Sequence, residues 1–180
     1  MAQFKAFAHG VSVNGETVLS VLDGMGGFKK KALQILSEKG IVDPQPGLWY
    51  PQQAWLDAFK EISDSIGKKT LFEIGKTVPN NAQWPQEIDS LEIALDSIDQ
   101  AYHMNHKDGE IGHYHFQKTG DNSGTMVCKN PYPCEFDFGI ITAVARKFKP
   151  SPTTVVSVKH DDSANCRRKG DDSCTYLITW

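Results

Sequence analysis

The first half of the chain carries apolar residues at helical spacing. An amphipathic helix is predicted over residues 28–36, ending at Gly40, after glycines that interrupt an earlier helical segment around residues 16–23. A further helix follows Pro51, with Trp55, Phe59, Ile62 and Ile66 on one face, and a second piece continues over 71–78 until Pro79. We expect Trp55 and Phe59 to lie in the core, because aromatic residues at helical spacing usually do.

The clearest helical pattern comes after Pro85. An apolar stripe is formed by Ile88, Leu91, Leu95, Ile98 and Tyr102, and acidic residues surround it. This helix is predicted to end near His106, because Asp108-Gly109 is a typical turn.

The pattern then changes to alternating and β-branched runs. Strands are predicted over 111–118 and 125–128, joined at Gly120-Asp121-Asn122, and over 153–158 and 174–180. One more helix is predicted over 135–148. Helices first and strands later indicate an α+β fold: a helical N-terminal lobe (1–107) packed on an antiparallel sheet with one late helix (108–180), in a single domain of 180 residues.

Composition narrows the class of protein. Hydrophobic residues make up 39% of the chain, charged residues 23%, and the net charge is −3, as in an ordinary globular domain. The basic residues are dispersed, which argues against a nucleic-acid partner, and no signal peptide or membrane segment is apparent. We therefore expect a cytoplasmic protein, in which thiols stay reduced and metal binding is favoured over structural disulfides.

All four cysteines fall in two turns, as the pairs Cys128/Cys134 and Cys166/Cys174. Two thiols in each turn suit a four-thiolate metal site, two disulfides or a redox switch, and an iron–sulfur cluster would use the same ligands. Cys134 is expected at the start of the late helix, where unpaired N–H groups lower a thiol pKa.

The C-terminal pattern C-R-x-x-G-x-x-x-C-x-Y-x-x-x-W, together with the order of elements, resembles the vinyl-4-reductase-type domain. Its superfamily includes the haem-nitric-oxide-binding (H-NOX) domains and the TRAPP subunits of Golgi transport. The resemblance covers residues 127–180 well and the rest loosely. It implies a ligand-binding module, often a homodimer with a signalling partner, in which the counterparts of Cys166 and Cys174 bind a structural zinc. The related phenol sensors take another zinc ligand from within the late helix, where this chain has no cysteine.

Five histidines lie in the second half of the chain. His103 and His106 are three apart on a helix, and His113 and His115 face one side of a strand, so the two pairs together would suit a transition metal. Alternatively, His103 and His106 face solvent or cap the end of the helix. The place of His103 is similar to that of the axial haem ligand in H-NOX domains, although the Tyr-x-Ser-x-Arg clamp for the haem propionates is absent. His160, just before the second cysteine turn, is a candidate substitute or supporting metal ligand.

A pocket for a small organic ligand is expected between the helices and the sheet. Its predicted polar contributors are Trp84, Tyr102, His106 and His113. No catalytic motif or dinucleotide fingerprint is present, so an enzyme, such as a tetrapyrrole vinyl reductase, is the minority interpretation.

The favoured hypothesis is thus a small-molecule sensing domain stabilised by zinc at Cys128, Cys134, Cys166 and Cys174. A thiol redox switch, a haem-based gas sensor that uses His103, and a passive adapter dimer are the alternatives.

Overall fold

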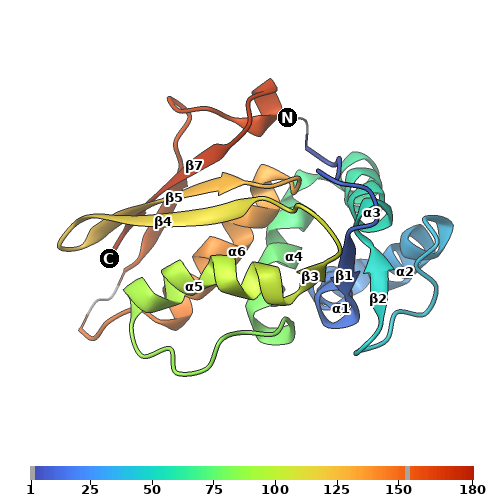
Figure 1. Cartoon of the computed structure of the whole chain (residues 1–180), viewed down its shortest axis with the longest axis horizontal. Coiled ribbons are helices and arrows are strands. Elements are labelled where there is room, and N and C mark those ends of the chain that lie inside the picture. The colour runs from blue at the N-terminus through green and yellow to red at the C-terminus, as the bar shows by residue number, and fades with distance from the viewer. Residues whose placement is uncertain (1–2, 153–154) are drawn as a thin grey trace.

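The computed structural model describes residues 3–152 and 155–180 (Figure 1). Its helical lobe contains α1 (Gly15–Gly24), α2 (Lys29–Glu38), α3 (Gln52–Ser65) and α4 (Lys68–Asn81), and a short 3₁₀ turn over Gly26–Phe28 separates the first two. The Asn14 side chain caps α1 by accepting a hydrogen bond from the Thr17 amide. Trp55 and Phe59 are fully buried, as expected from their spacing. Helix α4 continues to Asn81, past the predicted end at Pro79.

A small sheet that the sequence analysis missed joins the lobe to the rest of the molecule. Its strands are β1 (Ser12–Asn14), β2 (Trp49–Pro51) and β3 (His106–Lys107), in the order β2-β1-β3. Strands of two or three residues are too short to show an alternating pattern. His106, predicted at a helix end, is instead a strand residue that pairs with Val13.

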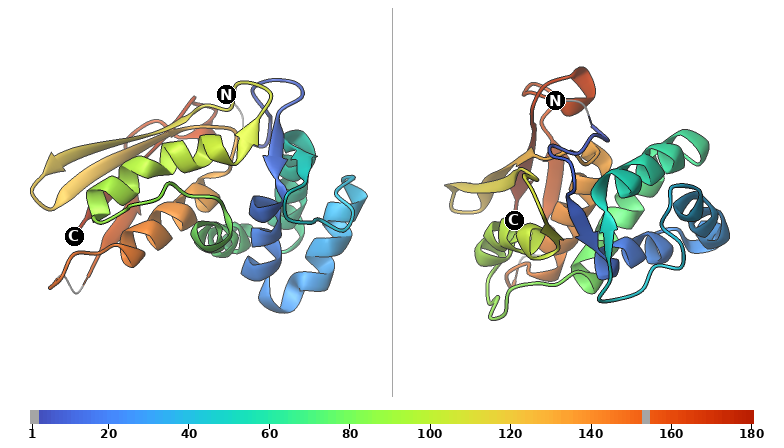
Figure 2. Two further views of the ribbon diagram at one scale, coloured as in Figure 1. Left: turned by 60° about the horizontal axis from the view of Figure 1, so that its bottom comes forward. Right: turned by 45° about the vertical axis from the view of Figure 1, so that its right-hand side comes forward.

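The second half forms a larger antiparallel sheet and two covering helices. The strands are β4 (His113–Gly120), β5 (Ser123–Lys129), β6 (Ser157–His160) and β7 (Cys174–Thr179), in the order β4-β5-β7-β6. The strand predicted over 153–158 begins outside the described residues and is observed over 157–160. Helices α5 (Leu91–Met104) and α6 (Cys134–Lys147) lie on one face of this sheet (Figure 2). The predicted α+β class is confirmed.

Two glycines allow α4 and α6 to cross at close range. A Cβ atom on Gly75 would lie 2.2 Å from the Phe136 carbonyl oxygen, and one on Gly139 would lie 2.3 Å from the Phe72 carbonyl oxygen. Because these neighbours are backbone atoms, neither glycine can be enlarged without moving a helix. This crossing positions the end of α4 and the start of α6, which contribute Val78 and Phe136 to the cavity described below.

In the described part of the chain, the helices lack the combined length and apolar character that a bilayer crossing requires.

Candidate metal centre and ligand cavity

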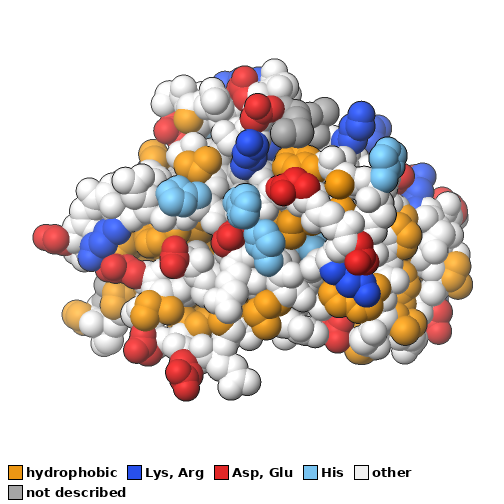
Figure 3. All heavy atoms as spheres, in the orientation of Figure 1, with side chains coloured by type: hydrophobic (Ala, Val, Ile, Leu, Met, Phe, Trp, Pro, Cys, Tyr) orange, Lys and Arg blue, Asp and Glu red, His pale blue; other side chains and the backbone are white. Residues whose placement is uncertain are grey.

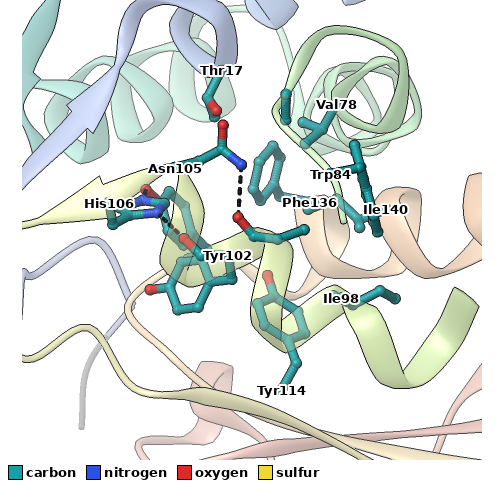
Figure 4. Close-up of a pocket in the computed structure, with 13 residues that line it drawn as sticks. Thr17, Val78, Trp84, Ile98, Tyr102, Asn105, His106, Tyr114, Phe136 and Ile140 are labelled. Carbon is teal, nitrogen blue, oxygen red and sulfur yellow. Dashed lines mark hydrogen bonds between the residues drawn. The ribbon is translucent and has the colours of Figure 1, made fainter. Parts of the chain in front are cut away.

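A cavity of about 40 Å³ lies between the helical lobe, α5 and α6 (Figure 4). Its apolar and aromatic walls come from α4, α5, α6, β4 and the loops beside them. The lining residues are Thr17, Val78, Ala82, Trp84, Ile98, Ala101, Tyr102, Asn105, His106, Tyr114, Tyr132, Phe136 and Ile140. A space of this size admits one or two water-sized groups.

His106 is a neutral, fully hydrogen-bonded part of the cavity wall. Its Nδ1 lies 2.8 Å from the Tyr102 carbonyl oxygen, and its Nε2 lies 2.6 Å from the Tyr132 hydroxyl oxygen. Because a carbonyl only accepts, the neutral ring carries its proton on Nδ1, and Nε2 accepts from the Tyr132 hydroxyl. Burial lowers the pKa of His106 to about 4, so the ring is uncharged at neutral pH.

Asn105 is the second polar group in the wall, and its amide is already committed. Its Nδ2 donates to the carbonyl oxygens of Ala101 (2.6 Å) and Gln83 (2.7 Å), and its Oδ1 accepts from Asn14 Nδ2 (2.6 Å). By contrast, Trp84 Nε1 and Thr17 Oγ1 are buried and have no hydrogen-bond partner among the described residues. The free polar capacity of the cavity therefore consists of one indole N–H and one hydroxyl.

A compact group of potential metal ligands, here called the cysteine group, lies at the start of α6. Cys134, His160, Cys166 and Cys174 each offer one ligand atom within 4.8 Å of the other three. The Cys134 sulfur is 3.0 Å from that of Cys174 and 3.8 Å from that of Cys166, and the Cys166–Cys174 distance is 3.9 Å. Tetrahedral zinc with Zn–S bonds of about 2.3 Å separates its sulfurs by about 3.8 Å, close to two of these three distances.

His160 is oriented as a fourth ligand would be. Its Nδ1 is 2.9 Å from the Asp162 carboxylate, while its buried Nε2 has no hydrogen-bond partner in the described residues. A carboxylate on one ring nitrogen and a metal on the other is the usual environment of a metal-binding histidine. The residues present therefore fit a zinc ion held by three cysteines and one histidine.

Local sequence explains how four ligands from distant positions meet. Cys134 is the first residue of α6, after Pro133, and Cys174 is the first residue of β7. Between them, Cys166 precedes a 3₁₀ turn (Arg167–Lys169) that ends at Gly170 with φ +95°, a left-handed conformation that favours glycine. His160 closes β6, the neighbour of β7.

The thiol with the lowered pKa is Cys174 rather than Cys134, where the helix terminus led us to expect it. Cys174 accepts a hydrogen bond from the Cys134 thiol, and this bond together with the nearby Arg167 guanidinium lowers the pKa of Cys174. The pKa of Cys134 is raised, because it is the donor of this bond and is partly buried. The hydrogen bond between the two thiols thus has a larger effect on their pKa values than the N-terminus of α6.

Cys128, the fourth predicted thiolate ligand, is not part of this group. It pairs directly with Cys174 across β5 and β7, but its thiol interacts with the buried carboxylate of Asp137. Burial and this neighbouring carboxylate raise the pKa of Cys128 well above its usual value. A thiol in this environment stays protonated. His160 takes the place that the sequence analysis gave to Cys128.

A buried ionic network that sequence reasoning missed lies between the cavity and the cysteine group. Arg167 pairs with Asp137 and also contacts both the carbonyl and the side-chain oxygen of Asn130. Asp137 Oδ1 accepts from the Tyr114 hydroxyl at 2.6 Å. An acid inside the otherwise apolar face of the late helix was the signal in the sequence, because such a residue requires a buried partner.

The remaining predicted residues divide between the cavity and the surface. Trp84, Tyr102 and His106 line the cavity together. His113 lies outside it, with 61% of its side chain exposed. His103 also points to solvent, and its Nδ1 is 2.8 Å from the Asp99 carbonyl oxygen. The Tyr132 and Phe136 side chains, which the sequence analysis did not select, lie in the cavity wall instead.

The fold is similar to that of H-NOX proteins of known structure. An H-NOX protein from S. oneidensis in the Fe(II)NO ligation state has a TM-score of 0.68 at 14% identity, over 92% of this chain and 97% of that chain. An unliganded Fe(II) H-NOX protein from K. algicida gives 0.61 at 14% identity, over 92% and 95%. A structure that probes haem distortion in the H-NOX family gives 0.63 at 15% identity, over 93% and 94%. No protein-family model and no curated protein sequence matches the chain.

Proposed function

We propose that this chain is a small-molecule sensing domain, in which the cavity takes a small, mainly apolar organic ligand and a zinc ion anchors the C-terminal strands. The observation that carries the ligand proposal is the cavity lining. Apolar walls with two unpartnered polar atoms, Trp84 Nε1 and Thr17 Oγ1, suit a molecule with one hydrogen-bond-accepting group. The H-NOX-like fold supports the same class of function.

Ligand entry requires a small rearrangement. A cavity of about 40 Å³ is smaller than the roughly 150 Å³ that holds a benzene ring in a dry protein interior. Trp84 belongs to the irregular segment between α4 and α5, outside any helix or strand. We expect this segment to move outward when a single-ring ligand binds.

The ligand proposal is tested with para-fluorophenol as the probe, observed by fluorine NMR. Saturable binding of one equivalent is expected. Ala101→Leu, which fills the cavity, should abolish it, and Trp84→Phe, which removes only the indole N–H, should weaken it. Trp49→Phe serves as the matched control, because Trp49 lies outside the cavity under Lys107. Binding that Ala101→Leu leaves intact would place the ligand elsewhere and contradict the proposal.

The zinc proposal rests on the three sulfurs and the unpartnered His160 nitrogen. The ion would join the start of α6, the end of β6 and the start of β7, so its binding energy would contribute to folding. A thiol redox switch is supported by the same contacts, and the 3.0 Å approach makes Cys134 and Cys174 its best pair. Zinc content and alkylation after mild oxidant separate the two: the zinc hypothesis expects one ion per chain, and the switch expects a reversible disulfide and no ion.

A haem-based gas sensor is the second candidate, favoured by the structural likeness to H-NOX proteins. The residues of the cavity do not fit haem. His103 lies on the surface, both ring nitrogens of His106 are hydrogen-bonded, and no Lys or Arg among the described residues lines the cavity to pair with the propionates. Reconstitution with haem tests this candidate: a Soret band that His103→Ala or His106→Ala abolishes would support it, and we expect no band.

The homodimer and the signalling partner remain proposals from the family resemblance. Sedimentation of the purified chain tests the dimer directly.

A further inference from the structure

A second group of potential metal ligands lies on the surface, where α5 meets β4. Asp99, His103 and His113 each offer one ligand atom within 4.8 Å of the other two. His113 Nδ1 is 3.3 Å from Asp99 Oδ2, His103 Nδ1 is 3.7 Å from the same oxygen, and the two imidazole centroids are 5.0 Å apart. Histidine side chains gather on this face of the molecule between α5 and β4 (Figure 3).

Hydrogen bonds hold this group in place, and a metal ion would replace the one between His113 Nδ1 and Asp99 Oδ2. Asp99 Oδ1 accepts from the Tyr114 amide at 2.8 Å, so Oδ2 faces the two histidines. His103 Nδ1 donates to the Asp99 carbonyl oxygen at 2.8 Å, which leaves the Nε2 lone pair for a metal. A backbone carbonyl on the second ring nitrogen is the usual support of a metal-ligating histidine.

The surrounding groove favours a cation. It is also lined by Asp96 and His115, and neither Lys nor Arg belongs to its lining in the described part of the chain. The three side chains are 32–61% exposed, so their imidazoles can rotate from the present spacing to the roughly 3.3 Å between ligand atoms in a tetrahedral site with bonds near 2.0–2.1 Å.

We propose that Asp99, His103 and His113 bind a divalent transition metal ion, with water in the remaining positions. Two imidazoles and one carboxylate suit Zn²⁺, Ni²⁺ and Cu²⁺ and are poor ligands for Mg²⁺ or Ca²⁺. The site contains no sulfur, so it differs in chemistry from the cysteine group and binds more weakly and reversibly. A metal here would join α5 to β4, and Tyr114, which bonds to Asp99, also lines the cavity.

The experiment uses the full chain purified with its cysteine site loaded with zinc, and Ni²⁺ as the probe. Nickel is paramagnetic and broadens nearby NMR signals. Because three thiolates retain zinc in the cysteine site, the broadening reports only binding at Asp99, His103 and His113. We expect one equivalent of nickel to broaden the imidazole signals of His103 and His113 first. His103→Gln, His113→Gln and Asp99→Asn should each weaken nickel binding at least about tenfold.

The matched control is His115→Gln, which lies two residues from His113 on the same face of β4 and outside the three-residue group. Because His115 only lines the groove and is not a ligand, this change should weaken nickel binding far less than His113→Gln does. The proposal is overturned if nickel binding does not saturate, or if His115→Gln weakens it as much as His113→Gln does. Release of zinc from the wild-type chain during the titration would also overturn it, because nickel would then occupy the cysteine site. Circular dichroism checks that each variant is folded.

Discussion

The Tyr114 hydroxyl donates a hydrogen bond of 2.6 Å to Asp137, and this contact joins the cavity wall to the cysteine group. Asp137 pairs with Arg167, whose backbone N–H and Nε lie 3.4 and 3.5 Å from the Cys174 sulfur. Tyr114, Asp137 and Arg167 are all buried. We therefore expect a change at Tyr114 to alter the hydrogen bonds at Cys174, and a change at Cys174 to alter those at Tyr114.

Tyr114→Phe removes one hydrogen bond from a buried carboxylate. We expect a loss of about 1–3 kcal/mol in the free energy of unfolding, the usual cost of an unsatisfied buried polar group. Chemical denaturation measures it. Tyr50→Phe is the control, because the Tyr50 hydroxyl accepts a hydrogen bond from the backbone amide of Gln45, an exposed residue. Equal stability of the two variants would mean that the contact to Asp137 contributes nothing.

Replacement of three of the four cysteines by serine should remove the bound zinc, whereas replacement of the fourth should not. Cys134→Ser, Cys166→Ser and Cys174→Ser are each expected to reduce bound zinc from about one equivalent to less than about a tenth, because structural zinc requires its complete ligand set. The melting temperature should fall by about 10 °C, which corresponds to about 3–4 kcal/mol in a domain of this size.

Cys128→Ser is the matched control for this series. It should retain zinc, because Cys128 lies outside the group of four ligand atoms. Loss of zinc from this variant would mean that Cys128, and not His160, is the fourth ligand.

Acidification should destabilise the protein through His106. Its pKa is about 4 in the folded chain and 6.5 when exposed, so the unfolded chain binds the proton more readily. Stability is therefore retained above pH 6.5 and lost as the pH falls toward 4, by about 3 kcal/mol once His106 is protonated in both states. Denaturation of the wild type and of His106→Gln across this range isolates the effect, since metal release is common to both. Parallel pH profiles would show that His106 does not titrate in this way.

Gly75→Ala should be strongly destabilising. The added methyl group would lie 2.2 Å from the Phe136 carbonyl oxygen, so α4 and α6 must separate, at a cost of about 1–3 kcal/mol or more. Gly27→Ala is the comparison, because nothing lies within 4 Å of a Cβ at Gly27. Denaturant midpoints of the two variants measure the difference, and similar midpoints would contradict the close crossing.

Much of the fold could be predicted because long helices and strands carry periodic patterns. The stripe that predicts α5 is continuous from Leu91 to Tyr102, although Ile88 lies before the helix, which Ser90 caps. The small sheet could not be predicted, since its pairing depends on contacts between Val13, Tyr50 and His106, which are distant in sequence.

The candidate site was predicted in part for the same reason. The cysteine spacing indicates two turns, but only the register of β5 with β7 and the packing of α6 decide which thiols meet. Cys128 lies outside the ligand group, and its pKa responds to the buried carboxylate of Asp137, a neighbour that is visible only in three dimensions. The cavity residues from α5 follow from its apolar face, whereas Tyr132 and Phe136 enter through the loop and helix that pack against it.

Elemental analysis of protein purified without chelator distinguishes a zinc-anchored domain without haem from a haem protein. After exhaustive dialysis, which removes weakly held ions, we predict about one zinc and no iron per chain. Iron at one equivalent would show that the chain carries haem or an iron–sulfur cluster, and less than about a tenth of an equivalent of zinc with four freely titratable thiols would show that zinc does not anchor the domain.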